Sequence, residues 1–150
     1  MSRTTTAILA LLFAGLSAGF ALCMSFVHYP TWVFIPPDAF REFQDASAVR
    51  TVPVAIALGV SSLVLTLITA IRGLPNVPRS VLWLAVILAA IPWVATPTIM
   101  IPLQERLATA GPESGLINEL LWKDILLRSL PPVIQSMLLL GAVLRWVRRS

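Results

Sequence analysis

The sequence has few residues of the kinds that carry redox or metal chemistry: it contains one cysteine, one histidine and 12% charged residues. With Cys23 alone, the chain can form neither an intramolecular disulfide nor a Cys-x-x-Cys pair, which excludes quinone reductases that need paired thiols. With His28 alone, it cannot supply both axial ligands of a bis-histidine haem. A glycine-rich phosphate loop and a His-Glu-x-x-His motif are also absent, so we expect no cofactor.

Copper is the one metal for which the sequence offers candidate ligands. Met24 and His28 are four residues apart, on one face of a helix, and Cys23 is adjacent. Soft ligands of this kind suit Cu(I). Because the chain has no second histidine and its methionines are dispersed, the set is too small to predict a metal site.

Carboxylates are missing from three of the five polar segments of the chain. Three lie between the first and second apolar stretches and four between the third and fourth: Asp38, Glu42, Asp45, Glu105, Glu113, Glu119 and Asp124. The N-terminus, the short middle loop and the C-terminus instead carry Arg3, Arg72, Arg79, Arg145, Arg148 and Arg149. Lys and Arg beside membrane spans prefer the cytoplasmic side, so we expect both termini in the cytoplasm and the two long loops outside.

Long apolar runs dominate the composition, with 57% hydrophobic residues and a mean hydropathy of +0.86. There are four, at roughly Thr6–Val27, Val52–Ile71, Val81–Ile101 and Leu126–Val143. Because about 20 apolar residues cross a bilayer core of about 30 Å, we predict one all-α domain over residues 1–150. It is a four-transmembrane-helix bundle in the inner membrane. The first run is longer than the apolar core of a signal peptide, about 7–15 residues, so we interpret it as a retained helix.

The formal net charge of +4 does not indicate nucleic acid. The basic excess lies at the predicted cytoplasmic boundary, where orientation and contact with anionic lipid account for it. Membrane lipid is therefore an expected partner, and nucleic acid is not.

Gly15 and Gly19 lie on one face of the first predicted helix, where a second backbone can approach closely. Two interpretations remain open: packing within the bundle, or a contact between two copies of the chain that forms a homo-oligomer.

Prolines and aromatic residues mark the predicted outer end of the bundle. Asp38 follows two prolines as a candidate N-cap, and Phe40 and Phe43 share one helical side, which predicts a short amphipathic helix in the first outer loop. Pro92 and Pro97 predict a kink or break in the outer half of helix three. A further pair, Pro131–Pro132, interrupts the path into helix four.

Polar residues at the outer helix ends form the strongest candidate site: His28, Gln104, Glu105, Arg106, Asn118, Asp124 and Arg128. In an antiparallel bundle these ends converge, and a histidine can exchange protons near neutral pH. Arg128 lies close to apolar depth, where a charge is costly unless it is paired or faces a cavity. Asp124, four residues earlier, is spaced to pair with it, so the two either neutralise each other or bind substrate.

The segment His28-Tyr-Pro-Thr-Trp-Val-Phe-Ile-Pro-Pro-Asp-Ala-Phe-Arg-Glu-Phe-Gln44 resembles the first outer loop of small four-helix membrane proteins of the anthrone-oxygenase-like superfamily. Ile101-Pro-Leu-Gln-Glu-Arg-Leu, and Leu121-Trp-Lys-Asp-Ile-Leu-Leu-Arg128, resemble the later signatures of that superfamily. Some relatives are associated with oxygenation of polycyclic aromatic anthrones to quinones. By position, the resemblance implies a pocket lined by His28, Tyr29, Trp32, Gln44, Gln104 and Arg128. Gln44 and Gln104 stand where related sequences often have histidine, so chemistry that needs those histidines would be lost or altered.

We therefore expect a membrane oxidoreductase, oxygenase-like, acting on a hydrophobic aromatic or quinone-like small molecule at the outer face. In this interpretation His28 removes a proton, and Arg128, with Gln104 or Asn118, stabilises the developing oxyanion. The catalytic candidates are His28, Arg128 and Asp124. The substrate-binding candidates are Tyr29, Trp32, Gln44, Gln104, Asn118 and Trp122. The alternative is a non-enzymatic lipid- or ligand-binding protein or an accessory subunit.

Overall fold

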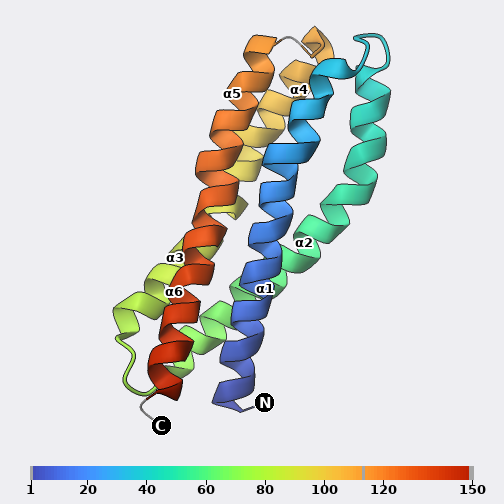
Figure 1. Ribbon diagram of the computed structural model, residues 1–150. Coiled ribbons are helices and arrows are strands. Elements are labelled where there is room, and N and C mark those ends of the chain that lie inside the picture. The colour runs from blue at the N-terminus through green and yellow to red at the C-terminus, as the bar shows by residue number, and fades with distance from the viewer. Residues whose placement is uncertain (1, 113, 149–150) are drawn as a thin grey trace.

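The computed structural model describes residues 2–112 and 114–148. This part of the chain has no strand. Its helices join end to end into four long helical segments, which we call rods, and each is long and apolar enough to cross a membrane: Arg3–Phe34, Phe40–Arg72, Arg79–Ala110 and Gly115–Val147. Both termini lie at one end of the bundle (Figure 1); we call the opposite end the distal end. The predicted all-α, four-helix architecture is confirmed.

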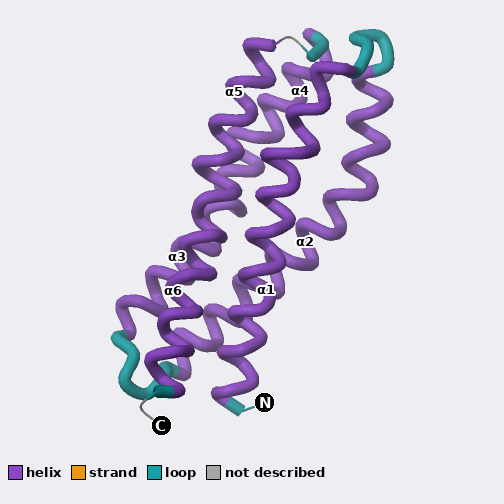
Figure 2. The backbone as a smooth tube through the Cα atoms, viewed as in Figure 1, coloured by secondary structure: helices purple, strands orange, loops and turns teal. Residues whose placement is uncertain are grey.

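The rods differ in how regular they are. The second rod is one continuous helix, α2 (Phe40–Arg72). The first consists of α1 (Arg3–Cys23), a π-helical segment (Met24–His28) and a 3-10 helix (Tyr29–Phe34). The third consists of α3 (Arg79–Ala95), a π-helical segment (Thr96–Met100) and α4 (Ile101–Ala110). The fourth consists of α5 (Ser114–Asp124), a π-helical segment (Ile125–Ser129) and α6 (Leu130–Val147). Loops are confined to the two ends of the bundle (Figure 2).

Each π segment in the described chain ends two residues before a proline: Pro30, Pro102 or Pro131. A proline has no N–H for the carbonyl four residues back, and its ring crowds that carbonyl, so a wider turn before it relieves both problems. The irregularities predicted in the outer half of the third rod and at the entry to the fourth are therefore present. In the third rod Pro92 lies inside the regular helix α3, and the π segment includes Pro97 and ends before Pro102. The irregularity before Pro30 has the same cause.

The segment predicted as a short amphipathic helix is helical but not separate, because it forms the first turns of α2. Asp38 is not its N-cap. Pro36 and Pro37 close a turn by accepting hydrogen bonds from the N–H groups of Ala39 and Phe40, so the helix begins after Asp38. Pro53 lies inside α2.

Alanines, not glycines, pack α1 into the bundle. Its buried residues include Ala7, Ala10 and Ala14. Gly15 and Gly19 are exposed, and a Cβ placed on either would meet no described atom within 4 Å. The interpretation that these glycines serve packing within the bundle is therefore wrong for the described chain.

Candidate functional site

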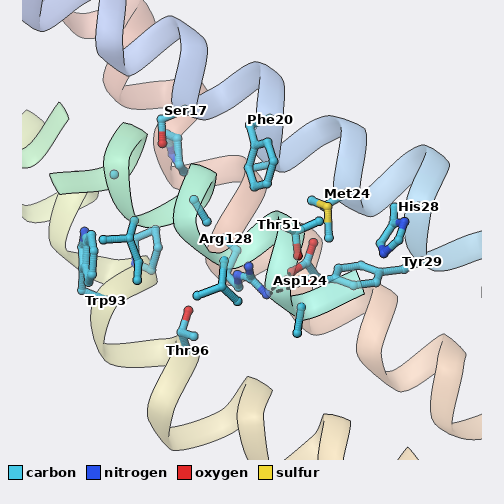
Figure 3. Close-up of a pocket in the computed structure, with 18 of the residues that line it drawn as sticks. Ser17, Phe20, Met24, His28, Tyr29, Thr51, Trp93, Thr96, Asp124 and Arg128 are labelled. Carbon is cyan, nitrogen blue, oxygen red and sulfur yellow. Dashed lines mark hydrogen bonds and ion pairs between the residues drawn. The ribbon is translucent and has the colours of Figure 1, made fainter. Parts of the chain in front are cut away.

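A cavity of about 440 Å³ lies in the middle and distal part of the bundle, with side chains from all four rods on its walls (Figure 3). Its volume falls within the range of about 300–1,000 Å³ that is common for small-molecule sites. Much of the wall is apolar, including Phe20, Met24, Ile56, Ala89, Trp93 and Pro132.

The cavity opens sideways between α2 and the third rod. Val52 and Ile56 on one side, and Trp93 and Ile101 on the other, line the cavity and are 38–49% exposed. The distal half of α2 leans away from the other rods (Figure 1). Both lips of the opening are apolar and belong to membrane-length helices.

Tyr29 and Arg128 form the centre of a polar group on the cavity wall (Figure 3). Arg128 Nη1 donates a hydrogen bond to the Tyr29 hydroxyl oxygen at 3.2 Å and lies 3.1 Å from Asp124 Oδ1. Gln104 Nε2 donates to the same tyrosine oxygen at 3.4 Å. Tyr29 is 2% exposed and the Asp124 side chain 1%, whereas the Arg128 side chain keeps 18% exposure, so the carboxylate side of the ion pair lies away from solvent. The structure brings these four site candidates together.

A stack of aromatic rings holds Tyr29 in place. Its ring meets that of Trp32 edge-on, with 4.8 Å between centroids, and Trp32 meets Phe40 in the same way at 5.4 Å. All three residues are buried. Because the neighbouring rings block rotation, the tyrosine hydroxyl is fixed towards Arg128.

Ser25 binds the second oxygen of Asp124 and is itself bound by Ser129. The Ser25 hydroxyl donates a short hydrogen bond to Asp124 Oδ2, and Ser25 Oγ lies 2.7 Å from Ser129 Oγ. A carboxylate can only accept, so the Ser25 proton is committed to Asp124 and Ser129 must donate to Ser25. All three residues are buried at about 1% exposure. The Asp124–Arg128 pair is thus anchored to the first rod through both Tyr29 and Ser25.

His28 occupies a separate position on the cavity wall. Its Nε2 atom lies 3.3 Å from Trp32 Nε1 and 2.9 Å from Ser47 Oγ. An indole N–H can only donate, so Nε2 acts as an acceptor and the imidazole is neutral with its proton on Nδ1. Ser47 then donates to the same nitrogen. Any proton transfer to Nε2 requires these two donors to move aside.

The remaining site candidates divide into two groups. Gln44 lines the cavity and donates from Nε2 to the backbone oxygen of Gln104 at 3.2 Å, joining α2 to α4. The second group is exposed, Trp122 with 67% of its surface accessible, and does not line the cavity: Glu105 and Arg106 on α4, and Asn118 and Trp122 on α5. The structure therefore does not bring these four residues to the site.

A second polar group lies nearer the middle of the bundle than the Tyr29–Arg128 group, on α2 and α6. Gln135 Nε2 donates to Ser62 Oγ at 3.0 Å and to Thr66 Oγ1 at 2.9 Å, linking α6 to α2. All three residues are buried, and Gln135 and Ser62 line the cavity. Interhelical hydrogen bonds of this kind hold membrane helices together.

Several polar residues of the site were not identified in the sequence. Ser25, Ser47, Ser129 and Gln135 all carry polar atoms to the site or its inner end. Serine in an apolar helix commonly bonds to its own backbone, so the serines do not indicate a site. Only Gln135, a large amide within an apolar run, could have been identified from the sequence as a candidate site residue.

Among the described residues, no group of three or more His, Cys, Asp or Glu is arranged to hold a metal ion. Cys23 is exposed whereas Met24 is buried, so these two candidate copper ligands diverge.

The fold and the cavity define an all-helical protein with four membrane-length helices and a polar group facing a side opening. No family model, no curated protein and no solved structure matches the chain significantly.

Proposed function

We propose that this protein takes a hydrophobic aromatic or quinone-like small molecule from the membrane and acts on it as an oxygenase-like oxidoreductase. The observation that carries the proposal is the cavity, which opens between apolar lips at membrane depth and presents the buried Tyr29–Arg128 pair. A buried charge on the wall of an accessible cavity in a membrane helix is a candidate functional group. The oxidation itself rests on the resemblance of three segments, His28–Gln44, Ile101–Leu107 and Leu121–Arg128, to anthrone-oxygenase-like proteins.

The roles of the residues follow from their positions. Arg128 and Gln104 both direct N–H donors to the Tyr29 oxygen, so a ligand oxygen beside it would share their positive field. Trp93 and Phe20 provide aromatic surface for the rings of the ligand. His28 accepts the proton of the ligand once Ser47 and Trp32 release its Nε2 atom. Removal of that proton leaves an electron-rich carbanion. Dioxygen, the oxidant, adds to this carbon, the peroxide anion takes a proton, and the hydroperoxide loses one water to leave the quinone carbonyl.

We also propose that the protein resides in the inner membrane with both termini in the cytoplasm. The terminus end of the bundle carries arginine without carboxylate, including Arg3, Arg72 and Arg145, which is typical of cytoplasmic boundaries. The distal end, with its acidic loops, then faces outward.

One observation favours the non-enzymatic alternative, a lipid- or ligand-binding protein or an accessory subunit. Arg128 already has the carboxylate of Asp124 at 3.1 Å and the oxygen of Tyr29 at 3.2 Å. An arginine paired in this way is compensated without any ligand. Under this alternative the cavity holds a molecule but no reaction follows.

Two measurements on the purified protein in nanodiscs separate these functions. Mass spectrometry of co-purified small molecules shows what occupies the cavity, and dioxygen uptake with added anthrone shows whether a reaction occurs. We expect a bound aromatic compound and anthrone-dependent oxygen uptake. Loss of a general base typically costs about 10²–10⁴-fold in rate, so His28→Ala should slow uptake on that order.

Thr98→Val is the matched control. Thr98 is exposed, does not line the cavity and uses its hydroxyl on the backbone oxygen of Val94. Uptake that is unchanged in His28→Ala contradicts the proton-transfer role. A bound aromatic compound without oxygen uptake supports the ligand-binding alternative, and phospholipid as the sole bound molecule supports an accessory role.

A further inference from the structure

Two polar atoms of the cavity wall, Asp124 Oδ1 and the Tyr29 hydroxyl proton, have hydrogen-bonding capacity that the described chain leaves unused. They lie close together, because both Asp124 Oδ1 and the Tyr29 oxygen contact the same Arg128 nitrogen, at 3.1 and 3.2 Å. One is an acceptor and the other a donor. A ligand group that satisfies both atoms must therefore contain both a hydrogen-bond donor and an acceptor.

The unused acceptor is Asp124 Oδ1. Arg128 Nη1 is near enough for an ion pair, but its N–H bonds do not point at this oxygen, which accepts no hydrogen bond from any described residue. The other oxygen, Oδ2, is satisfied by Ser25. The Asp124 side chain is 1% exposed and lines the cavity. A buried carboxylate oxygen without a hydrogen bond is costly, so a donor inside the cavity would stabilise it.

The unused donor is the Tyr29 hydroxyl. Its oxygen accepts hydrogen bonds from Arg128 Nη1 and Gln104 Nε2, and neither of these nitrogen atoms can accept the phenolic proton in return. The phenolic proton has no acceptor among the described hydrogen bonds of this residue. The aromatic stack with Trp32 fixes the ring, so the proton can rotate about the C–O bond but the oxygen cannot move away.

We propose that Asp124 Oδ1 and the Tyr29 hydroxyl together bind a hydroxyl group of the ligand, so that the cavity selects phenols or alcohols over the matching ethers, carbonyls and quinones. The ligand hydroxyl donates to Asp124 and accepts from Tyr29. This inference rests on the proposed function, because it assigns the chemical class of the molecule that enters the same cavity. It implies that anthrone binds as its hydroxyl-bearing tautomer, anthrol, and that the quinone product, which lacks a hydroxyl group, is released.

Other polar groups fit the two atoms less well. A carbonyl can accept from Tyr29 but leaves Asp124 Oδ1 without a partner. A carboxylate would be repelled by Asp124, and an ammonium group by Arg128 at the same place. Water offers the same donor and acceptor as a hydroxyl, so a ligand hydroxyl exchanges for water without loss of hydrogen bonds. A ligand without a hydrogen-bond donor that displaces this water leaves Asp124 Oδ1 without a hydrogen bond, which weakens its binding.

The test uses three probes that differ at one position: 2-naphthol, 2-methoxynaphthalene and naphthalene. Binding to the full chain in nanodiscs is measured by equilibrium dialysis, with empty nanodiscs giving the lipid partition of each probe. We expect 2-naphthol to bind about tenfold or more tightly than its methyl ether, since a hydrogen bond to a charged group is lost in the ether. Tyr29→Phe and Asp124→Asn should reduce this ratio to about twofold or less, and Thr98→Val should leave it unchanged.

The outcomes separate this inference from the function on which it rests. Equal affinity for naphthol and its ether in the native protein overturns the hydroxyl assignment while leaving an aromatic cavity. Binding of none of the three probes overturns both. If a variant fails to fold, as judged by circular dichroism, the comparison of naphthol and ether in the native protein still decides the question. A ratio that persists in a folded Tyr29→Phe variant and a folded Asp124→Asn variant also overturns the assignment.

Discussion

The indole ring of Trp93 lies against the backbone of Gly59: a Cβ placed on this glycine would stand 2.9 Å from Trp93 Cζ2. Gly59 belongs to α2 and Trp93 to α3, and both line the cavity. Trp93 is 38% exposed and lies at the side opening of the cavity. The absence of a side chain at position 59 is therefore what allows the ring to rest there.

Gly59→Ala tests this contact. Because the added methyl group overlaps the Trp93 ring, we expect the variant to lose about 1–3 kcal/mol of stability, the usual cost of overpacking. Gly15→Ala is the control, since a Cβ there meets no described atom within 4 Å. Unfolding followed by circular dichroism in detergent measures both. The double variant Gly59→Ala with Trp93→Ala should lose less stability than the sum of the losses in the two single variants, because the overlap is then relieved. Equal losses of stability in Gly59→Ala and Gly15→Ala would contradict the contact.

The fourth rod contains two acid–base pairs at the same spacing but with opposite burial. Arg128–Asp124 is buried, with side-chain exposures of 18% and 1%, whereas Lys123–Glu119 is 42% and 36% exposed. Arg128→Met leaves the carboxylate buried and unpaired, and we expect it to cost about 3–5 kcal/mol. Lys123→Met should cost less than about 1 kcal/mol, because exposed pairs contribute little.

Chemical unfolding of the two variants in the same detergent makes this comparison. Adding Asp124→Asn to Arg128→Met should restore part of the lost stability, since it removes the unpaired charge. A similar small loss in both single variants would show that water reaches the Arg128 pair.

The four rods and the Asp124–Arg128 pair could be predicted because they follow from simple rules. Apolar runs of membrane length predict helices, and residues four apart on a helix are neighbours. Prolines also indicated where two of the rods become irregular. The rest of the site depends on which side chains the π segments bring to the same face of a rod, and this cannot be predicted from the sequence.

Asp124 and Ser129 illustrate the limit. Residues five apart on an α-helix point about 140° from one another, given 3.6 residues per turn. The π turn between Asp124 and Ser129 widens the helix, and both residues contact Ser25. Ser47 was missed for a related reason: its segment was expected at the membrane surface, but it continues into α2 and reaches His28.

A cysteine cross-link tests the register that the π turn creates. Ser25 Oγ and Ser129 Oγ are 2.7 Å apart, so cysteines at both positions are close enough for a disulfide. In a Cys23→Ala background, we expect Ser25→Cys with Ser129→Cys to cross-link under mild oxidation, detected as a loss of two hydrogens by mass spectrometry. Ser25→Cys with Ser136→Cys is the control, because the Ser136 hydroxyl donates to Pro132 instead. Cross-linking of the control with equal yield would mean that the fourth rod has another register.

The outward-facing glycines of α1 leave a smooth strip that no described residue of the chain covers. We propose a second copy of the chain as its partner, because paired small residues four apart let two membrane helices approach closely. The native protein should then show a dimer fraction that rises with the protein-to-detergent ratio. Light scattering coupled to size exclusion measures this fraction.

Replacing both Gly15 and Gly19 by leucine separates the dimer contact from the fold. Since a Cβ at either position meets nothing within 4 Å, the variant should keep its helical content and unfolding temperature while the dimer is lost. Ala14→Leu, on the fully buried face of the same helix, should instead destabilise the bundle, because there is no room for the larger side chain. A native protein that stays monomeric at every ratio, or a leucine variant that still dimerises, would show that the glycine strip faces lipid.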